Sequence, residues 1–162
     1  MVNTNAIVEI VDKITKINNS PCKKTLQKIV FLVENKHIDL GCEYGIHFYG
    51  PYSADLDFAV RELCDRGVLK IDYTPKEHLI SVANRTSVKH SLDAAVDEII
   101  DKFGQKSPSE LELIATALYM YKCLKDKEKI KAGVKKLKGS KYTDYKINAA
   151  INLLIETGYI EA

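Results

Sequence analysis

Similar short sequence segments occur in the same order in the two halves of the chain, and this repeat limits the possible folds more than any other feature. Residues 60–71 read VRELCDRGVLKI and residues 151–162 read INLLIETGYIEA, an offset of 91 positions. A fixed period in sequence indicates one supersecondary unit used twice. Two further pairs match upstream in the same order, namely residues 9–14 with 98–103 and Ser20-Pro21 with Ser107-Pro108.

The repeated unit predicts a mainly α chain with a small β-hairpin, in a winged-helix-like fold. Each unit has the order helix, Ser-Pro, helix, spacer, helix, glycine and short strand, which outlines a helix-turn-helix domain with a wing. Two tandem units of this type are expected, at residues 1–84 and 90–162. Apolar periodicity and capping residues predict helices at 4–17, 21–34, 53–66, 91–103, 108–124, 126–137 and 143–157.

Strands are expected where apolar residues alternate between turn signals. Residues 68–73 and 78–82 predict a hairpin wing around Thr74-Pro75-Lys76-Glu77. Residues 44–49 predict a further short strand, which a turn at Gly50-Pro51 then ends. Ser20 is expected to cap the second helix with Pro21 in its first turn, and one or two strand residues are expected after Gly158.

Composition places the chain among ordinary globular proteins of the cytoplasm. Hydrophobic residues make up 46% of it and charged residues 28%, and no apolar run approaches the roughly 20 residues of a membrane span. The N-terminus lacks the pattern of a secretory signal. Four separated cysteines form no CxxC pair, so we expect reduced thiols rather than disulfides or a zinc ribbon.

Signals for catalysis, metal ions or cofactors are weak. The chain has no GxSxG, GxGxxG, P-loop or HExxH motif. Asp93, Asp97 and Asp101 follow one edge of a predicted helix and could hold a divalent cation, but exposed acids on a solvated helix face are the plainer interpretation. We therefore expect neither an enzyme nor a bound metal or cofactor.

One segment resembles a known group of proteins. Leu26-Gln27-Lys28-Ile29-Val30-Phe31-Leu32 is followed by Phe48-Tyr49-Gly50-Pro51-Tyr52-Ser53 and by a helix that ends at Gly67. This order resembles the YwgA-type proteins and, more distantly, the SocA-like antitoxin domain, also called Panacea. The resemblance covers roughly residues 20–70. It implies a winged-helix-like, non-enzymatic protein, and SocA-like domains are associated with antitoxin roles.

The Gly-Pro segment of that motif has two interpretations. Glycine tolerates the conformations that a bulky residue before proline cannot adopt, so the segment can be a structural corner that the flanking tyrosines pin in place. It can also be a partner-binding site, because exposed tyrosines are frequent hot spots of protein interfaces. The residues of that candidate site are Tyr49, Gly50, Pro51, Tyr52 and Ser53.

Positive charge gathers near the end of the chain. Residues 122–162 hold ten lysines against five acidic residues, whereas residues 1–121 hold 14 basic against 17 acidic residues. This segment can be a solvated helix face, a nucleic-acid surface or a site for an acidic protein partner. The candidate nucleic-acid-binding residues are Lys125, Lys129, Lys131, Lys135, Lys136, Lys138, Lys141, Tyr142 and Lys146.

The expected function is binding of a macromolecule. Segment 53–66 carries two arginines against four acids, so it would repel DNA, and the lysine-rich segment is the better candidate for phosphate contacts. The lack of arginine there favours backbone contacts over base-specific recognition. A DNA-binding transcriptional regulator that acts as a homodimer is the first hypothesis. An antitoxin or adaptor that binds a protein through the Gly-Pro corner is the alternative.

Overall fold

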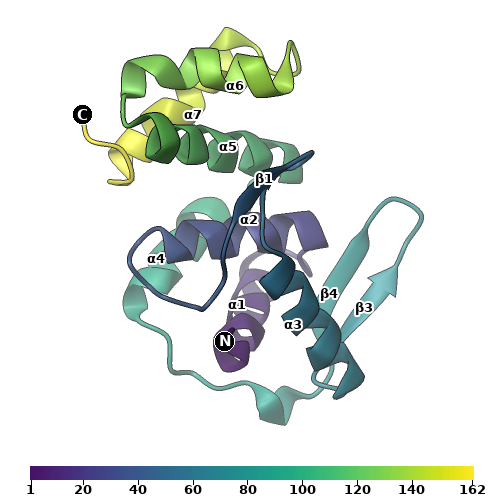
Figure 1. The fold of residues 1–162 in the computed structure, drawn as a ribbon. Coiled ribbons are helices and arrows are strands. Elements are labelled where there is room, and N and C mark those ends of the chain that lie inside the picture. The colour runs from purple at the N-terminus through teal and green to yellow at the C-terminus, as the bar shows by residue number, and fades with distance from the viewer.

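Seven α-helices and two short β-hairpins make up the structure, a computed structural model that describes every residue from Met1 to Ala162 (Figure 1). The chain is thus mainly helical, as the sequence predicts. In chain order the elements are α1 Thr4–Ile17, α2 Lys23–Glu34, β1 Gly45–His47, β2 Gly50–Tyr52, α3 Ala54–Asp65, β3 Leu69–Tyr73, β4 His78–Val82, α4 Ala94–Phe103, α5 Pro108–Leu124, α6 Ile130–Lys138 and α7 Asp144–Glu156, with 3-10 turns at Arg85–Ser87 and Lys127–Lys129.

The β3–β4 hairpin forms where the sequence predicts the wing. Its strands pair antiparallel from Leu69 opposite Val82 to Tyr73 opposite His78. Strand β4 packs on α1 and also pairs with the segment between α1 and α2, where Cys22 lies opposite Leu79. The predicted cap of α2 is therefore wrong: the Pro21 carbonyl accepts a 2.8 Å hydrogen bond from the Ile80 amide before the helix begins, and Cys22, in extended backbone, caps the helix.

A second hairpin, β1–β2, occupies the spacer between α2 and α3. Its strands run antiparallel, with Ile46 opposite Pro51. The expected turn lies two residues too late in the sequence, because Phe48 and Tyr49 make the turn and Gly50-Pro51 belong to the returning strand. Gly50 has a φ of +93°, and an added Cβ would lie 2.8 Å from Oγ1 of Thr116 on α5. Both the backbone conformation and the close approach of α5 require glycine here.

The second half of the chain packs directly on the first. Helix α4 lies against α1 and α2, and α5 lies against α2 and β2. Helices α5, α6 and α7 each contact the other two and form a small bundle, and Figure 1 shows the tip of the β1–β2 hairpin beside α5. Helix α4 begins three residues later than expected, because the amides of Ser91 and Leu92 donate to the carboxylate of Glu9 on α1 before Asp93 caps the helix.

Buried side chains from both halves form one hydrophobic cluster of 37 residues. It includes Ile10 and Ile29 from the first half, and Ile100 and Leu118 from the second. The division into two units, at residues 1–84 and 90–162, stays a prediction about how the chain is organised.

The ends of α3 and α7 share one hydrogen-bond pattern at the offset of 91 positions. The Val68 amide donates to Leu63 at 2.9 Å, and the Tyr159 amide donates to Leu154 at 2.9 Å. The intervening Gly67 and Gly158 have φ values of +75° and +81°, as expected for C-terminal caps. No strand follows Gly158, because the Ile160 amide also donates to Leu154 and folds the segment back onto α7.

None of the helices combines the length and the hydrophobicity that crossing a membrane would require.

Candidate functional site

Helix α2 clamps the end of the β1–β2 hairpin through the side chain of Gln27. The Gln27 amide group donates to the carbonyl of Ser53 at 2.9 Å, and the Ser53 amide donates back to Gln27 Oε1 at 2.8 Å. Both residues are buried. The side chain thus pairs with backbone as a neighbouring strand would, and it satisfies a donor and an acceptor that would otherwise be buried without partners.

Lys28 extends this clamp to the middle of β2. Its ammonium group donates to the carbonyl of Pro51 at 2.7 Å, and the residue is only 2% exposed. Burial lowers the pKa of Lys28 to about 8; attraction to Glu112 opposes the shift, and repulsion from Lys24 and Lys138 adds to it. The charged form of Lys28 is therefore bound to the β1–β2 hairpin at a cost in desolvation free energy.

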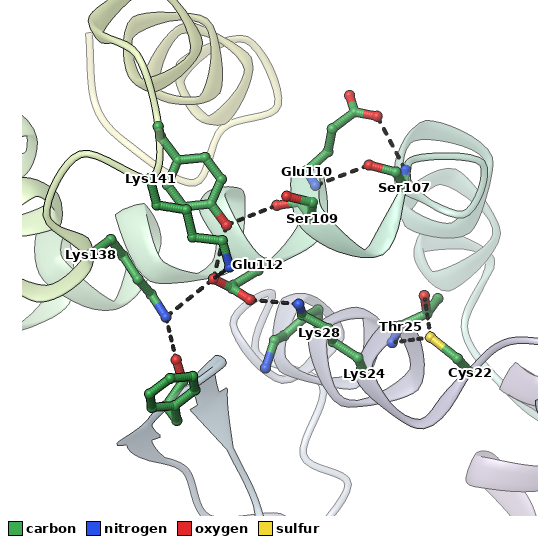
Figure 2. A network of polar contacts seen from close by, with 12 residues as sticks. Cys22, Lys24, Thr25, Lys28, Ser107, Ser109, Glu110, Glu112, Lys138 and Lys141 are labelled. Atoms are coloured by element: carbon green, nitrogen blue, oxygen red, sulfur yellow. Dashed lines mark hydrogen bonds and ion pairs between the residues drawn. The ribbon is translucent and has the colours of Figure 1, made fainter. Parts of the chain in front are cut away.

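Glu112 on α5 forms ion pairs with three lysines, which come from α2, from α6 and from the segment after α6. Its carboxylate is fully buried and lies 2.6 Å from the ammonium of Lys24, 2.7 Å from that of Lys141 and 3.2 Å from that of Lys138. Figure 2 shows Lys138 and Lys141 converging on Glu112, with α2 on its other side. The hydroxyl of Tyr142 donates a fourth contact at 2.9 Å.

The charge of Glu112 is strongly favoured by these partners. Burial acts to raise its pKa, but hydrogen bonds from Lys141, Lys24 and Tyr142 outweigh burial and hold the pKa at about 2. The ammonium of Lys138 also donates to the carbonyl of Phe48 at 2.6 Å, so one of the lysines that contact Glu112 also binds the turn of the β1–β2 hairpin. We call Glu112, Lys24, Lys138, Lys141 and Tyr142 the Glu112 centre.

The structure divides the candidate nucleic-acid-binding residues into three groups. Lys138, Lys141 and Tyr142 belong to the Glu112 centre, and Tyr142 is only 6% exposed. Lys131 and Lys135 pair with Asp144 at the start of α7. The remaining residues of the set are exposed and form no ion pair, namely Lys125, Lys129, Lys136 and Lys146.

The candidate partner-binding residues also divide. Gly50, Pro51 and Ser53 are buried, as expected for a structural corner. Tyr52 is half-buried and its ring lies 4.7 Å from the ring of His47, while Tyr49 is 56% exposed.

The most exposed aromatic side chain of this region lies outside that candidate set. Phe48 is 86% exposed, and Ile46 is exposed on the same hairpin. The run Ile-His-Phe-Tyr before Gly-Pro was an available signal, because apolar residues at a hairpin turn have little core to enter. We call Ile46, Phe48 and Tyr49 the hairpin patch.

Two of the three aspartates considered as metal ligands have other partners. Asp93 caps α4 through the amide of Ala95, and Asp97 forms an ion pair with Lys13 on α1. Asp101 is exposed on the same helix.

A curated protein of Bacillus subtilis (strain 168), named Uncharacterized protein YwgA, is similar to this chain over most of its length. The two are 31% identical over 143 residues, which cover 83% of this chain and 85% of the relative. The relative's name assigns no activity. No protein-family model matches the chain.

Replacing Gln27 tests the clamp. We expect Gln27→Ala to lower the free energy of unfolding by about 2–4 kcal/mol, because two buried hydrogen bonds are lost and the Ser53 backbone groups are left without partners. Gln105→Ala is the control, since Gln105 makes one exposed bond to the carbonyl of Ile17. Urea unfolding measures both variants; equal, small changes would contradict the clamp.

The Glu112 centre predicts a pH dependence of stability. The folded-state pKa of Glu112, about 2, lies below its ordinary value of 4.5, so its contribution is complete above pH 4.5 and is lost as the pH falls toward 2. A shift of this size corresponds to about 3 kcal/mol. We expect Glu112→Gln to be less stable at pH 7 and to show a flatter decline over this interval.

Urea unfolding at a series of pH values measures this effect. The matched control is Glu98→Gln, which changes an exposed carboxylate on α4 that forms no ion pair. If the Glu112→Gln profile ran parallel to that of the wild type, the centre would not carry the stability assigned to it.

Proposed function

The chain belongs to the YwgA-type family, and on that premise we propose that it is a non-catalytic module that binds a protein partner, in the manner of an antitoxin or an adaptor. The hairpin patch carries this proposal. Phe48 and Tyr49 expose 86% and 56% of their surface beside the exposed Ile46. Exposed aromatic residues that lie together are typical anchors of protein interfaces.

The hairpin patch is held in place before any partner arrives. The ring of Phe48 packs edge-on against Tyr49 with a centroid distance of 5.0 Å, and the ammonium of Lys24 lies 4.8 Å from the centre of the Tyr49 ring. Lys138 binds the Phe48 carbonyl from α6. A surface that is already ordered loses less conformational entropy on binding, which favours affinity.

The perturbed ionisable groups fit a binding module without requiring catalysis. Lys28 and Glu112 have shifted pKa values, but each is engaged by structural partners, the Pro51 carbonyl and the lysines of the Glu112 centre respectively. Burial accounts for the lowered pKa of Lys28, and hydrogen bonds from the lysines and from Tyr142 account for the lowered pKa of Glu112.

The order of elements in the first half supports a winged-helix fold. Helix α1 is followed by the short pairing segment at Cys22, then by α2, α3 and the β3–β4 hairpin. In DNA-binding members of such folds, the third helix enters the major groove. Here α3 presents exposed Asp55, Glu62 and Asp65, which disfavour phosphate and are compatible with a protein surface.

The hairpin patch predicts which variant loses the partner. We expect Phe48→Ala to abolish a complex that the wild-type chain forms with a co-purifying protein, while its melting temperature stays within about 2 °C of the wild type, because an exposed surface substitution changes stability little. Tyr145→Ala is the control, since Tyr145 is 82% exposed on α7, away from the hairpin.

Reconstitution from purified components and isothermal titration calorimetry provide the measurement. A Phe48→Ala variant that retains the wild-type affinity would exclude the hairpin patch as the binding site.

A DNA-binding regulator is the second candidate, favoured by the lysines that form no ion pair. Lys129 and Lys136 are exposed on or beside α6, and Lys146 is exposed on α7. Replacing all three by Glu should abolish gel shifts of duplex DNA, and the wild-type log affinity should fall against log salt by roughly 0.9 for each phosphate contacted. Salt-independent binding, or an unaffected triple variant, would exclude this function.

A further inference from the structure

A groove of about 510 Å³ lies beside the hairpin patch. Its walls come from the first turns of α2, the tip of the β3–β4 hairpin, the β1–β2 hairpin and Pro108 at the start of α5. This volume falls in the range of sites that hold a peptide segment or a small ligand. Segments distant in sequence therefore meet at one concave surface.

The lining of the groove has more basic than acidic side chains. Lys23, Lys24, Lys28 and Lys76 line it against two acids, Asp57 and Glu77. Lys28 is nearly buried and donates to one protein acceptor, the Pro51 carbonyl. Lys24 already contacts Glu112, and Lys23 lies 3.9 Å from Asp57, while Lys76 at the hairpin tip is exposed and forms no ion pair. The groove thus offers positive charge to an incoming anion.

The remaining walls suit an extended peptide. Tyr49 and Tyr52 supply aromatic faces, and Gln27 and His78 supply polar groups. A single nucleic-acid strand carries a phosphate at each nucleotide and would meet Asp57, Glu77 and the acidic α3 beside them. A peptide can place carboxylates near the lysines and leave uncharged backbone elsewhere. Basic clusters bind acidic motifs in this manner.

We propose that this groove binds an acidic, extended segment of the protein partner. This inference rests on the proposed function, because it describes the chemical nature of one segment of the protein partner proposed there. Tyr49 belongs to both the hairpin patch and the groove, so a partner that anchors on Phe48 reaches the lysines directly.

The test uses the full chain and a fluorescein-labelled peptide that alternates Glu and Gly over eight residues. We expect saturable binding in fluorescence anisotropy at low salt, and no binding of the matched peptide that alternates Gln and Gly. Lys76→Glu should weaken binding by roughly fivefold or more, since the variant replaces an attraction by a repulsion. Lys70→Glu makes the same change of net charge on β3 outside the groove, and should change affinity by less than about twofold.

Three results would overturn the proposal: no saturable binding of the acidic peptide, equal effects of Lys76→Glu and Lys70→Glu, or tighter binding of an oligothymidylate of matched length. Failure here is distinct from failure of the proposed function. Phe48 does not line the groove, so loss of the partner by Phe48→Ala, with wild-type behaviour of Lys76→Glu, would retain the hairpin patch and exclude the groove.

Discussion

The buried carboxylate of Glu112 is the interaction on which the arrangement of the two halves depends. Burying a charge is costly unless its partners replace the lost water, and removal of one partner leaves the others uncompensated. Glu112 meets this requirement with lysines from α2 and α6, a lysine after α6, and a tyrosine hydroxyl. It therefore fixes α5 and α6 against the first half. Lys138 extends the same contacts to the Phe48 carbonyl.

This arrangement gives a physical account of the motif through which the chain resembles its family. Gln27 and Lys28 of the Leu-Gln-Lys segment bind the backbone of Ser53 and Pro51 in the Gly-Pro segment. Gly50 is needed because α5 approaches it closely. The motif thus builds one rigid corner, and the residue that projects from it, Phe48, lies just before the Gly-Pro pair. The supporting residues and the proposed binding surface are thus adjacent in sequence but differ in role.

The sequence predicts the local elements well and the long-range contacts poorly. Helices α1 and α5 match their expected bounds, because apolar periodicity and, for α5, the capping box at Ser107 and Glu110 are local signals. The cap of α2 and the start of α4 were misplaced, since their backbone groups bond to Ile80 and Glu9, far away in the chain.

Burial within the lysine-rich segment could not be predicted for the same reason. The sequence pattern of basic and aromatic residues is typical of a nucleic-acid-binding surface, and it includes Lys138, Lys141 and Tyr142. Their shared acceptor, Glu112, lies 26 to 30 positions earlier, on another helix. Only the fold brings this acceptor to them. The same limit applies to Lys28: a lysine is expected at the surface, yet this residue is only 2% exposed.

Native-state hydrogen exchange of the Ser53 amide tests most directly whether the β1–β2 hairpin is locked to the core. This amide donates to Gln27 within the clamp, whereas the Leu118 amide lies in the buried part of α5. If the hairpin is locked, both amides should open with the same free energy, that of global unfolding. An opening free energy for Ser53 that is several kcal/mol below that of Leu118 would show that the hairpin detaches alone, and would contradict the account.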